Sequence, residues 1–157
     1  YQAGHLNVAF VFDAHQSGLN DRVQLPPLQG QLIHATCTFS QEYGWLFLTT
    51  QVQGKIHHLC VVIQANGDIA ATAETTSGTD HWLAAIGKKA PGCAIAHFLL
   101  TATDDGIMRI ELQQGQLIHT KTFPDTESFV DSNCQLLPAP NGLYVVNSHE
   151  IYQLSIA

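Results

Sequence analysis

Short apolar or alternating segments, separated by short polar turns, fill most of this chain. Ala94–Thr103 is apolar and β-branched, and Ile107–Leu112 alternates between the two faces of a strand. Asp104-Asp105-Gly106 between them has the composition of a tight hairpin turn, because Gly tolerates the positive φ that a two-residue loop requires. Gly115 turns the chain again before a third strand, Leu117–Phe123. The pattern predicts a local, antiparallel unit.

An earlier stretch of the chain has the same organisation. Asn66-Gly67 is a strong hairpin signal, and a second turn falls at Gln51–Gly54. These turns separate four predicted strands, which are Leu32–Phe39, Gly44–Thr50, Lys55–Ile63 and Ile69–Thr75. The stretch therefore predicts a four-stranded antiparallel meander. We expect His81–Ile86 to open the next unit, and no segment predicts an amphipathic helix of convincing length.

The two ends of the chain contribute fewer strands. Cys134–Pro140, Leu143–Asn147 and Ile151–Ile156 predict a third unit that lacks its outer strand. Leu6–Phe12 predicts a strand, and we expect it to fill that gap beside the last one. A polar loop, Asp13–Asp21, follows it. Two adjacent prolines then confine Val23–Leu28 to a sheet edge or a linker.

A six-residue stretch occurs twice, letter for letter. Gln29–His34 and Gln114–His119 both read Gln-Gly-Gln-Leu-Ile-His, and a weaker copy, Asn66–Ala70, lies between them. Internal repetition at about 40 to 50 residues indicates stacked or radially arranged units. We therefore interpret the chain as one domain of three units. They span about residues 31–75, 81–123 and 134–156, the last one completed by strand 6–12.

Consecutive four-stranded meanders turned by Asp-Gly or Asn-Gly resemble the blades of a β-propeller. The stretch Thr103–Leu112 resembles the middle hairpin of WD-repeat and quinoprotein-like blades. No Trp-Asp dipeptide ends a strand, and neither Trp45 nor Trp82 has the position of the quinoprotein signature, so the type of blade stays open. Propellers close with about four to eight blades. The resemblance implies an all-β partial ring, completed by a second copy, another chain or further sequence; a β-trefoil is the alternative fold.

Composition and charge exclude some classes of partner. With 45% hydrophobic and 12% charged residues, a chain of 157 residues is expected to fold around a core. A net charge of −7 with six Lys and Arg provides no basic surface for nucleic acid. No apolar run is long enough to span a membrane and no signal peptide is evident. We expect a cytoplasmic protein with neither nucleic acid nor membrane as its partner.

The cysteines are widely spaced and lie in apolar strand contexts, at positions 37, 60, 93 and 134. Reduced thiols in the core of a cytoplasmic protein account for them. Two disulfides in an exported chain are the alternative, with three conceivable pairings.

Nine histidines raise the question of a metal site. His34 and Cys37 lie three residues apart in a predicted strand and so face opposite sides. Of His57, His58 and Cys60, only the last two share a face. Zinc sites with strong sequence signatures pair their ligands across turns. We therefore predict no metal and no cofactor, and expect hydrogen-bonded or surface histidines.

The longest polar loop, Pro124–Asn133, is acidic. Asp125, Glu127 and Asp131 offer oxygen ligands, but the loop lacks the glycine and the closing glutamate of a helix-loop-helix calcium site, so a solvated loop is expected. No nucleophile elbow, phosphate-binding glycine loop or dinucleotide fingerprint is present. Catalytic residues are therefore unknown, although an active site assembled from scattered residues would leave no such signature.

The leading hypothesis is a non-catalytic protein-binding or scaffold module, which presents its loops to a protein partner or to a second copy of the chain. The expected binding residues come from two polar loops and are Asp80, His81, Asp125, Glu127 and Asp131. The alternative is a propeller enzyme or a domain that binds a sugar or another small ligand. Its stacking surfaces would be drawn from Trp45, Trp82, Tyr43 and Tyr144, for which core packing is the other explanation.

Overall fold

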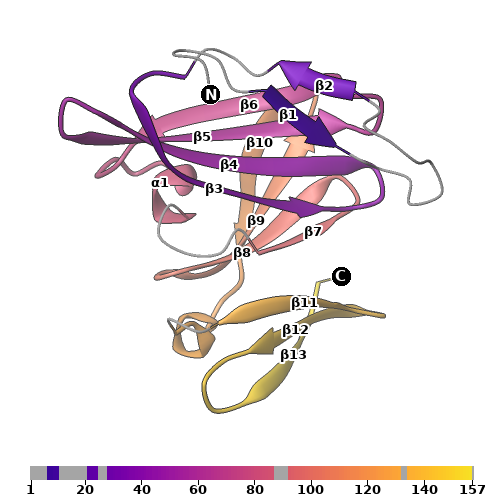
Figure 1. Cartoon of the computed structure of the whole chain (residues 1–157). Coiled ribbons are helices and arrows are strands. Elements are labelled where there is room, and N and C mark those ends of the chain that lie inside the picture. The colour runs from indigo at the N-terminus through magenta and orange to yellow at the C-terminus, as the bar shows by residue number, and fades with distance from the viewer. Residues whose placement is uncertain (1–6, 11–20, 25–27, 87–91, 132–133, 157) are drawn as a thin grey trace.

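The protein is described from a computed structural model, which covers residues 7–10, 21–24, 28–86, 92–131 and 134–156. Within these ranges the chain consists of antiparallel β-sheets, with one short α-helix and one 3₁₀ turn (Figure 1). The predicted all-β class and the predicted four-stranded meanders are confirmed. The strands form separate open sheets, which favours the meander prediction over a β-trefoil.

The first sheet is a meander in which each strand pairs with the next in sequence. The two-residue turn Gln53-Gly54, with φ of 49° and 78°, joins its second and third strands. Asn66 stabilises the next turn, since its Oδ1 accepts a hydrogen bond from Asp68 N. The strands are β3 (Gln31–Phe39), β4 (Tyr43–Val52), β5 (Lys55–Gln64) and β6 (Ile69–Thr76).

The second sheet has four strands, whereas the sequence pattern predicts three between Ala94 and Phe123. The expected single strand Ala94–Thr103 is two strands, because the backbone reverses at Ala96 and His97. Ala96 has a φ of 49°, and its carbonyl accepts a hydrogen bond from the Ser40 hydroxyl at 2.8 Å. The predicted hairpin turns at Asp104-Asp105 and at Gly115 are confirmed. The strands are β7 (Cys93–Ile95), β8 (Phe98–Thr103), β9 (Gly106–Gln113) and β10 (Gln116–Thr122).

The third sheet has three strands, β11 (Gln135–Ala139), β12 (Gly142–Val146) and β13 (Ile151–Ser155), as predicted for a unit without its outer strand. The expected completion of this sheet by the N-terminal strand is wrong. Instead, β1 (Asn7–Phe10) pairs with β2 (Asp21–Gln24) in a sheet of its own. The predicted loop at 13–21 lies outside the described residues except for Asp21, as do both prolines of the predicted edge segment.

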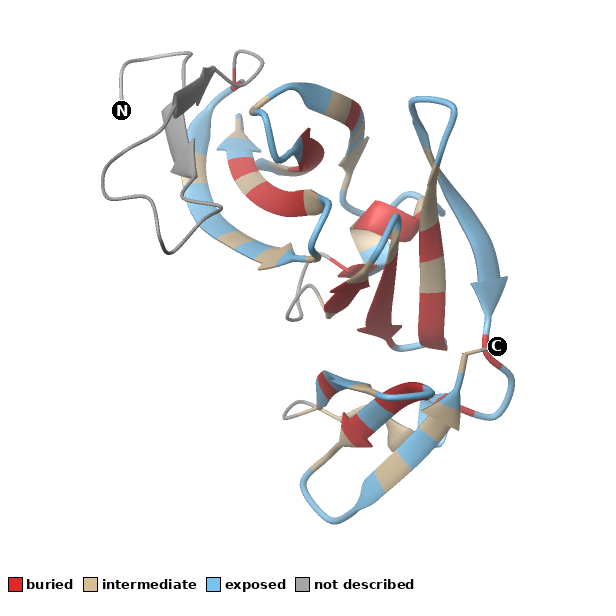
Figure 2. Ribbon diagram, turned by 90° about the vertical axis from the view of Figure 1, so that its right-hand side faces the viewer, coloured by how far each residue is buried: buried red, intermediate tan, exposed pale blue. Residues whose placement is uncertain are grey.

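The three larger sheets stack one after another in chain order (Figures 1 and 2). Among the contacts between sheets, β3 lies against β7 and β6 lies against β10, so the first strands are neighbours and the fourth strands are neighbours. The third sheet continues this order, because its first strand, β11, contacts β7 and β8. The middle sheet is therefore covered on both faces.

The sheets are held together by two apolar cores. Between the first and second sheets lie Trp45, Phe47 and Cys60 on one side and Leu99, Met108 and Ile110 on the other. Between the second and third sheets lie Leu100, Ala102, Ile107, Leu136, Leu143 and Val145. Each core buries a row of side chains from alternate positions of its strands, which explains why the central strands are apolar on both faces.

A short helix forms where the second unit is expected to begin. Trp82–Ile86 forms α1, and Trp82, Leu83 and Ile86 are buried in the first of the two cores. His81 begins the helix, since its Nδ1 accepts a hydrogen bond from Leu83 N at 3.1 Å. The second sheet then starts at Cys93, after residues 87–91, which lie outside the described ranges.

The repeated hexapeptide has the same local structure in both copies but a different place in its sheet. Gly30 and Gly115 have φ of 76° and 75°, and each is followed by an edge strand in which Leu is half-buried and Ile and His are exposed. The first copy begins β3, a first strand, and the second begins β10, a fourth strand. The weaker copy at Asn66 also precedes a fourth strand, β6. The hexapeptide thus encodes a turn and an edge strand.

Candidate functional site

Three polar dipeptides lie side by side on neighbouring strands of the first sheet. Thr49-Thr50 on β4, His57-His58 on β5 and Thr75-Thr76 on β6 are in register, so that Thr50 pairs with His57 and His57 pairs with Thr76. Directly paired residues share a face of the sheet. The row of Thr50, His57 and Thr76 therefore faces one side of the sheet, and the row of Thr49, His58 and Thr75 faces the other.

The row of Thr50, His57 and Thr76 opens into a cavity of about 290 Å³. Thr76 Oγ1 lies 3.5 Å from His57 Nδ1, and Thr50 is buried. The floor is apolar, because Leu28 and Leu59 belong to the cluster that covers the outer face of the sheet. The described residues that line the cavity are Leu28, Gln29, Thr50, His57, His58, Leu59, Glu74, Thr75 and Thr76.

On the opposite face, His58 is buried in a small hydrogen-bonded network. Its Nδ1 lies 3.3 Å from Thr49 Oγ1, and its Nε2 lies 2.7 Å from Ser77 Oγ. Burial lowers the pKa of His58 below its usual value of 6.5, and the neighbouring imidazole of His57 lowers this pKa further. The network holds a neutral imidazole under the cavity.

The cavity residues were not among the predicted site residues, although a signal for them exists in the sequence. A two-residue turn at Gln53-Gly54 places residues at equal distances from the turn opposite each other, and this pairs Thr50 with His57. The sequence pattern predicts a wider turn at Gln51–Gly54, and it indicates hydrogen-bonded or surface histidines without bringing Thr50, His57 and Thr76 together.

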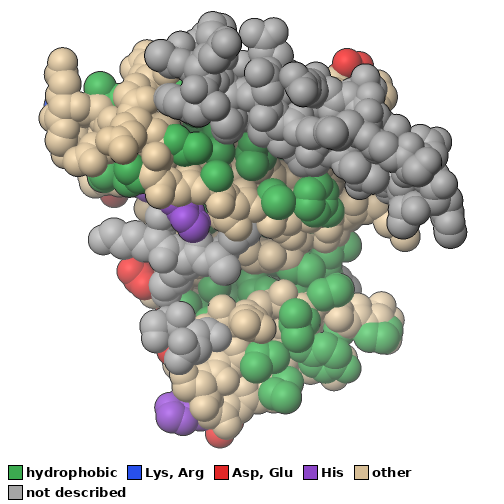
Figure 3. All heavy atoms as spheres, viewed as in Figure 1, with side chains coloured by type: hydrophobic (Ala, Val, Ile, Leu, Met, Phe, Trp, Pro, Cys, Tyr) green, Lys and Arg blue, Asp and Glu red, His purple; other side chains and the backbone are tan. Residues whose placement is uncertain are grey.

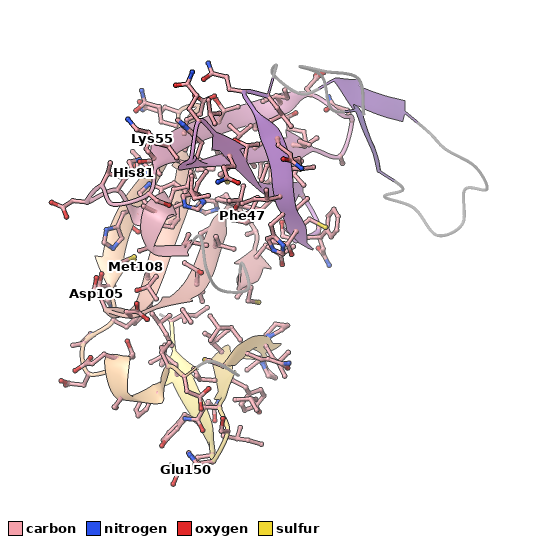
Figure 4. The ribbon with its side chains drawn as sticks, turned by 60° about the vertical axis from the view of Figure 1, so that its left-hand side comes forward. Phe47, Lys55, His81, Asp105, Met108 and Glu150 are labelled. Atoms are coloured by element: carbon pink, nitrogen blue, oxygen red, sulfur yellow. The ribbon has the colours of Figure 1, made fainter. Side chains whose placement is uncertain are left out.

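Two of the predicted binding residues lie at the start of α1. Asp80 is exposed, whereas the ring of half-buried His81 begins the helix and packs 5.2 Å from the Trp82 ring, centroid to centroid. Figure 4 shows His81 beside this helix, away from the loop that carries the other three predicted residues, which lies beyond Asp105. His81 is therefore occupied in a structural contact.

The other three predicted residues lie in the loop that joins the second and third sheets. Asp125 has a φ of 58°, and Glu127 begins the 3₁₀ turn η1 (Glu127–Phe129); both are exposed. Asp131 instead fixes the loop, because its Oδ2 accepts a hydrogen bond from Ser148 N at 2.9 Å. The five predicted residues do not form one site.

The histidine and cysteine side chains lie as the strand pattern predicts. His34 pairs with Thr49 and Cys37 pairs with Leu46, which places them on opposite faces of the first sheet. In the part of the chain that the structure describes, no three His, Cys, Asp or Glu side chains are grouped for metal binding. Cys37, Cys60 and Cys93 are free thiols; Cys60 and Cys93 are buried, whereas Cys37 is exposed, contrary to the expectation of a core position.

The aromatic side chains proposed as sugar-stacking surfaces are mostly core residues. Trp45 is fully buried and Trp82 is 8% exposed, so neither ring offers a face to a ligand. Tyr43 packs against the same core. Tyr144 differs, because it lies on the outer face of the third sheet and is 38% exposed.

That outer face is a second candidate surface. Leu137 pairs with Tyr144, and Val146 pairs with Ile151, so these side chains share the side of the sheet that points away from the stack. Leu137 is 46% exposed and Ile151 is 71% exposed. Figure 3 shows hydrophobic side chains at the surface of this part of the molecule. We call Leu137, Tyr144, Val146 and Ile151 the terminal apolar face.

Comparisons with known proteins supply no further assignment. The chain matches no protein-family model, and no curated protein or solved structure is significantly similar to it. The described residues contain no helix that is both long enough and apolar enough to cross a membrane. Functional inference therefore rests on the cavity and on the terminal apolar face.

Proposed function

We propose that this chain is a non-catalytic protein-binding or scaffold module of the cytoplasm, built from propeller-type blades, and that a second copy of the chain binds its terminal apolar face. Its interaction surface is then a sheet face, and the acidic loops have no part in it. The free thiols of Cys37, Cys60 and Cys93 support a reducing compartment.

The order of the stack supports a partial ring. The first and second sheets place first strand beside first strand and fourth strand beside fourth strand, and the first strand of the third sheet lies against β7 and β8, as expected for successive blades of a propeller. The interfaces between the first and second sheets and between the second and third sheets are both apolar. The terminal apolar face continues this series, since its alternate positions carry Leu137, Tyr144 and Ile151 where a further sheet would pack.

Charge supports a second copy as the partner. The outward positions of the third sheet carry no Lys, Arg, Asp, Glu or His, although the chain has a net charge of −7. Those positions are Gln135, Leu137, Ala139, Gly142, Tyr144, Val146, Ile151, Gln153 and Ser155. Association through this face therefore brings no ionised side chains together, and exposed apolar patches of this kind mark protein interaction sites.

Light scattering of the purified chain tests the proposal. We expect a dimer that dissociates on dilution. We expect Leu137→Lys or Ile151→Lys to give a monomer with an unchanged circular dichroism spectrum. Ile118→Lys is the matched control, because Ile118 is an exposed apolar residue on β10, 38% exposed, outside the terminal apolar face. A wild-type chain that is monomeric at all concentrations contradicts the proposal, as does a dimer that survives both substitutions.

A further inference from the structure

The cavity beside His57 lies on the first sheet, in a different part of the stack from the terminal apolar face. Strand pairing fixes three of its polar groups independently of any loop, since β4, β5 and β6 each contribute one residue to the Thr50, His57 and Thr76 row. Glu74 lies on the same face, because it pairs with Leu59, and this pair is two residues along the strands from the pair of Thr76 and His57. The site is thus built on rigid strands.

The groups that line the cavity both donate and accept hydrogen bonds. The hydroxyls of Thr50 and Thr76 do both, the imidazole of His57 offers one of each when neutral, and the Gln29 amide offers both. The carboxylate of Glu74 accepts only. A ligand that satisfies this set must itself present several groups that donate and accept, and hydroxyl groups have this property.

The charges of the lining disfavour ions. No Lys or Arg is among the described residues around the cavity, while Glu74 contributes a carboxylate, so phosphate or carboxylate ligands would lack a cationic partner and meet a like charge. A cation would meet one carboxylate, that of exposed Glu74, whereas the hydroxyls, the Gln29 amide and the apolar side chains of the lining carry no charge. A neutral ligand is left.

The apolar part of the lining suits a ring with one carbon-hydrogen face. Leu28 is 6% exposed and Leu59 is 7% exposed, and both lie in the apolar cluster beneath the polar row. A volume of about 290 Å³ falls at the lower end of small-molecule pockets, which are roughly 300 to 1,000 Å³. The volume matches a small ring.

We propose that the cavity formed by Thr50, His57, Thr76, Glu74, Leu28 and Leu59 binds a small neutral polyhydroxylated ring, of the size of a monosaccharide or a cyclitol. The Thr and His side chains hydrogen-bond its hydroxyl groups, and Leu28 and Leu59 contact its carbon-hydrogen face. This site is independent of self-association at the terminal apolar face.

Nuclear magnetic resonance titration of the full chain tests the inference. The probes are D-glucose, D-mannose and myo-inositol, with inorganic phosphate and ethanolamine as the anionic and cationic comparisons. We expect saturable shifts of the Thr50, His57 and Thr76 amides with at least one of the three neutral compounds, and none with phosphate or ethanolamine.

Substitutions then separate the cavity from the rest of the sheet. Thr50→Val and Thr76→Val each remove one hydroxyl at constant volume, and we expect each to weaken binding roughly 3- to 10-fold, the effect of one net hydrogen bond. Thr72→Val is the control, because Thr72 is exposed on the same strand as Thr76 and outside the cavity. Absence of any shift with the neutral compounds, binding of phosphate or ethanolamine instead, or equal weakening by Thr72→Val overturns the inference.

Discussion

The Nε2 atom of His58 lies 2.7 Å from the hydroxyl oxygen of Ser77, and this contact ties the middle of β5 to the loop after β6. The other ring nitrogen faces Thr49 on β4. Three consecutive segments are therefore joined through one buried imidazole, whose pKa is lowered chiefly by its burial. Protonation of this ring must weaken the folded state.

The first prediction concerns stability below neutral pH. Because the pKa of His58 lies lower in the folded chain than its usual 6.5, the unfolded chain takes up this proton more readily. The stability that the neutral His58 imidazole contributes is fully present above pH 6.5 and is lost as pH falls through the lowered folded-state pKa. Urea unfolding at pH 7.5 and 5.5 should show a larger loss for the wild type than for His58→Gln, whose amide stays neutral. Equal losses would contradict the assignment.

The second prediction compares two fully buried threonines. Thr126 Oγ1 accepts a hydrogen bond from Ile107 N and donates one to Phe123 O, both at 2.8 Å, whereas Thr101 Oγ1 has no hydrogen-bond partner among the described residues. Thr126→Val strands two buried backbone groups and should lower the free energy of unfolding by about 2 to 4 kcal/mol. Thr101→Val should be neutral or stabilising. Chemical denaturation of both variants measures this, and Thr126→Ser should restore most of the loss.

The third prediction uses the repeated hexapeptide as its own control. Gly30 and Gly115 have nearly equal φ, so an alanine at either position meets similar backbone strain of about 1 kcal/mol. A Cβ at Gly30 would lie well within 3.0 Å of the Gln51 carbonyl oxygen, while one at Gly115 has the Ala70 oxygen at 3.8 Å as its neighbour. Gly30→Ala should therefore destabilise the chain clearly more than Gly115→Ala in thermal unfolding. Equal losses of stability would show that β4 shifts to make room for the added methyl group without further destabilisation.

The fourth prediction concerns thiol reactivity. Cys37 is exposed on β3, whereas Cys60 is fully buried and its pKa is raised by that burial. The thiolate is the reactive form. Brief treatment of the native protein with iodoacetamide, followed by mass spectrometry, should label Cys37 and spare Cys60 until denaturant is added. Cys37→Ser should remove the fast reaction, and early labelling of Cys60 would contradict the packing of the first core.

Most of the strands could be predicted because their signals are local. Alternation in Ile107–Leu112 and the turns at Asp104-Asp105 and Gly115 involve residues within a few positions of each other, and all are present in the structure. The turn at Ala96 carries no glycine or asparagine to mark it. The hydroxyl that bonds the Ala96 carbonyl belongs to Ser40, 56 residues away, so the cause is not visible in the local sequence.

The site was less predictable than the strands for a related reason. The polar row of Thr50, His57 and Thr76 exists through register, and register on the β6 side includes an irregularity between Val62 and Ile63. The loops that looked most polar proved instead to be structural in part, since His81 begins a helix and Asp131 fixes a backbone amide. The polarity of these residues in the sequence therefore did not distinguish residues that bind a partner from residues that begin a helix or fix a loop.

Each strand of the three stacked sheets pairs only with its neighbours in sequence, so every ladder of backbone hydrogen bonds closes over a short loop. Such local contacts favour rapid folding, because little chain entropy is lost before pairing begins. The β3–β6 sheet is complete once Thr76 has been synthesised, and each later sheet can fold against the one before it. The molecule can therefore assemble in the direction of translation, with each apolar core closing as the later of its two sheets forms.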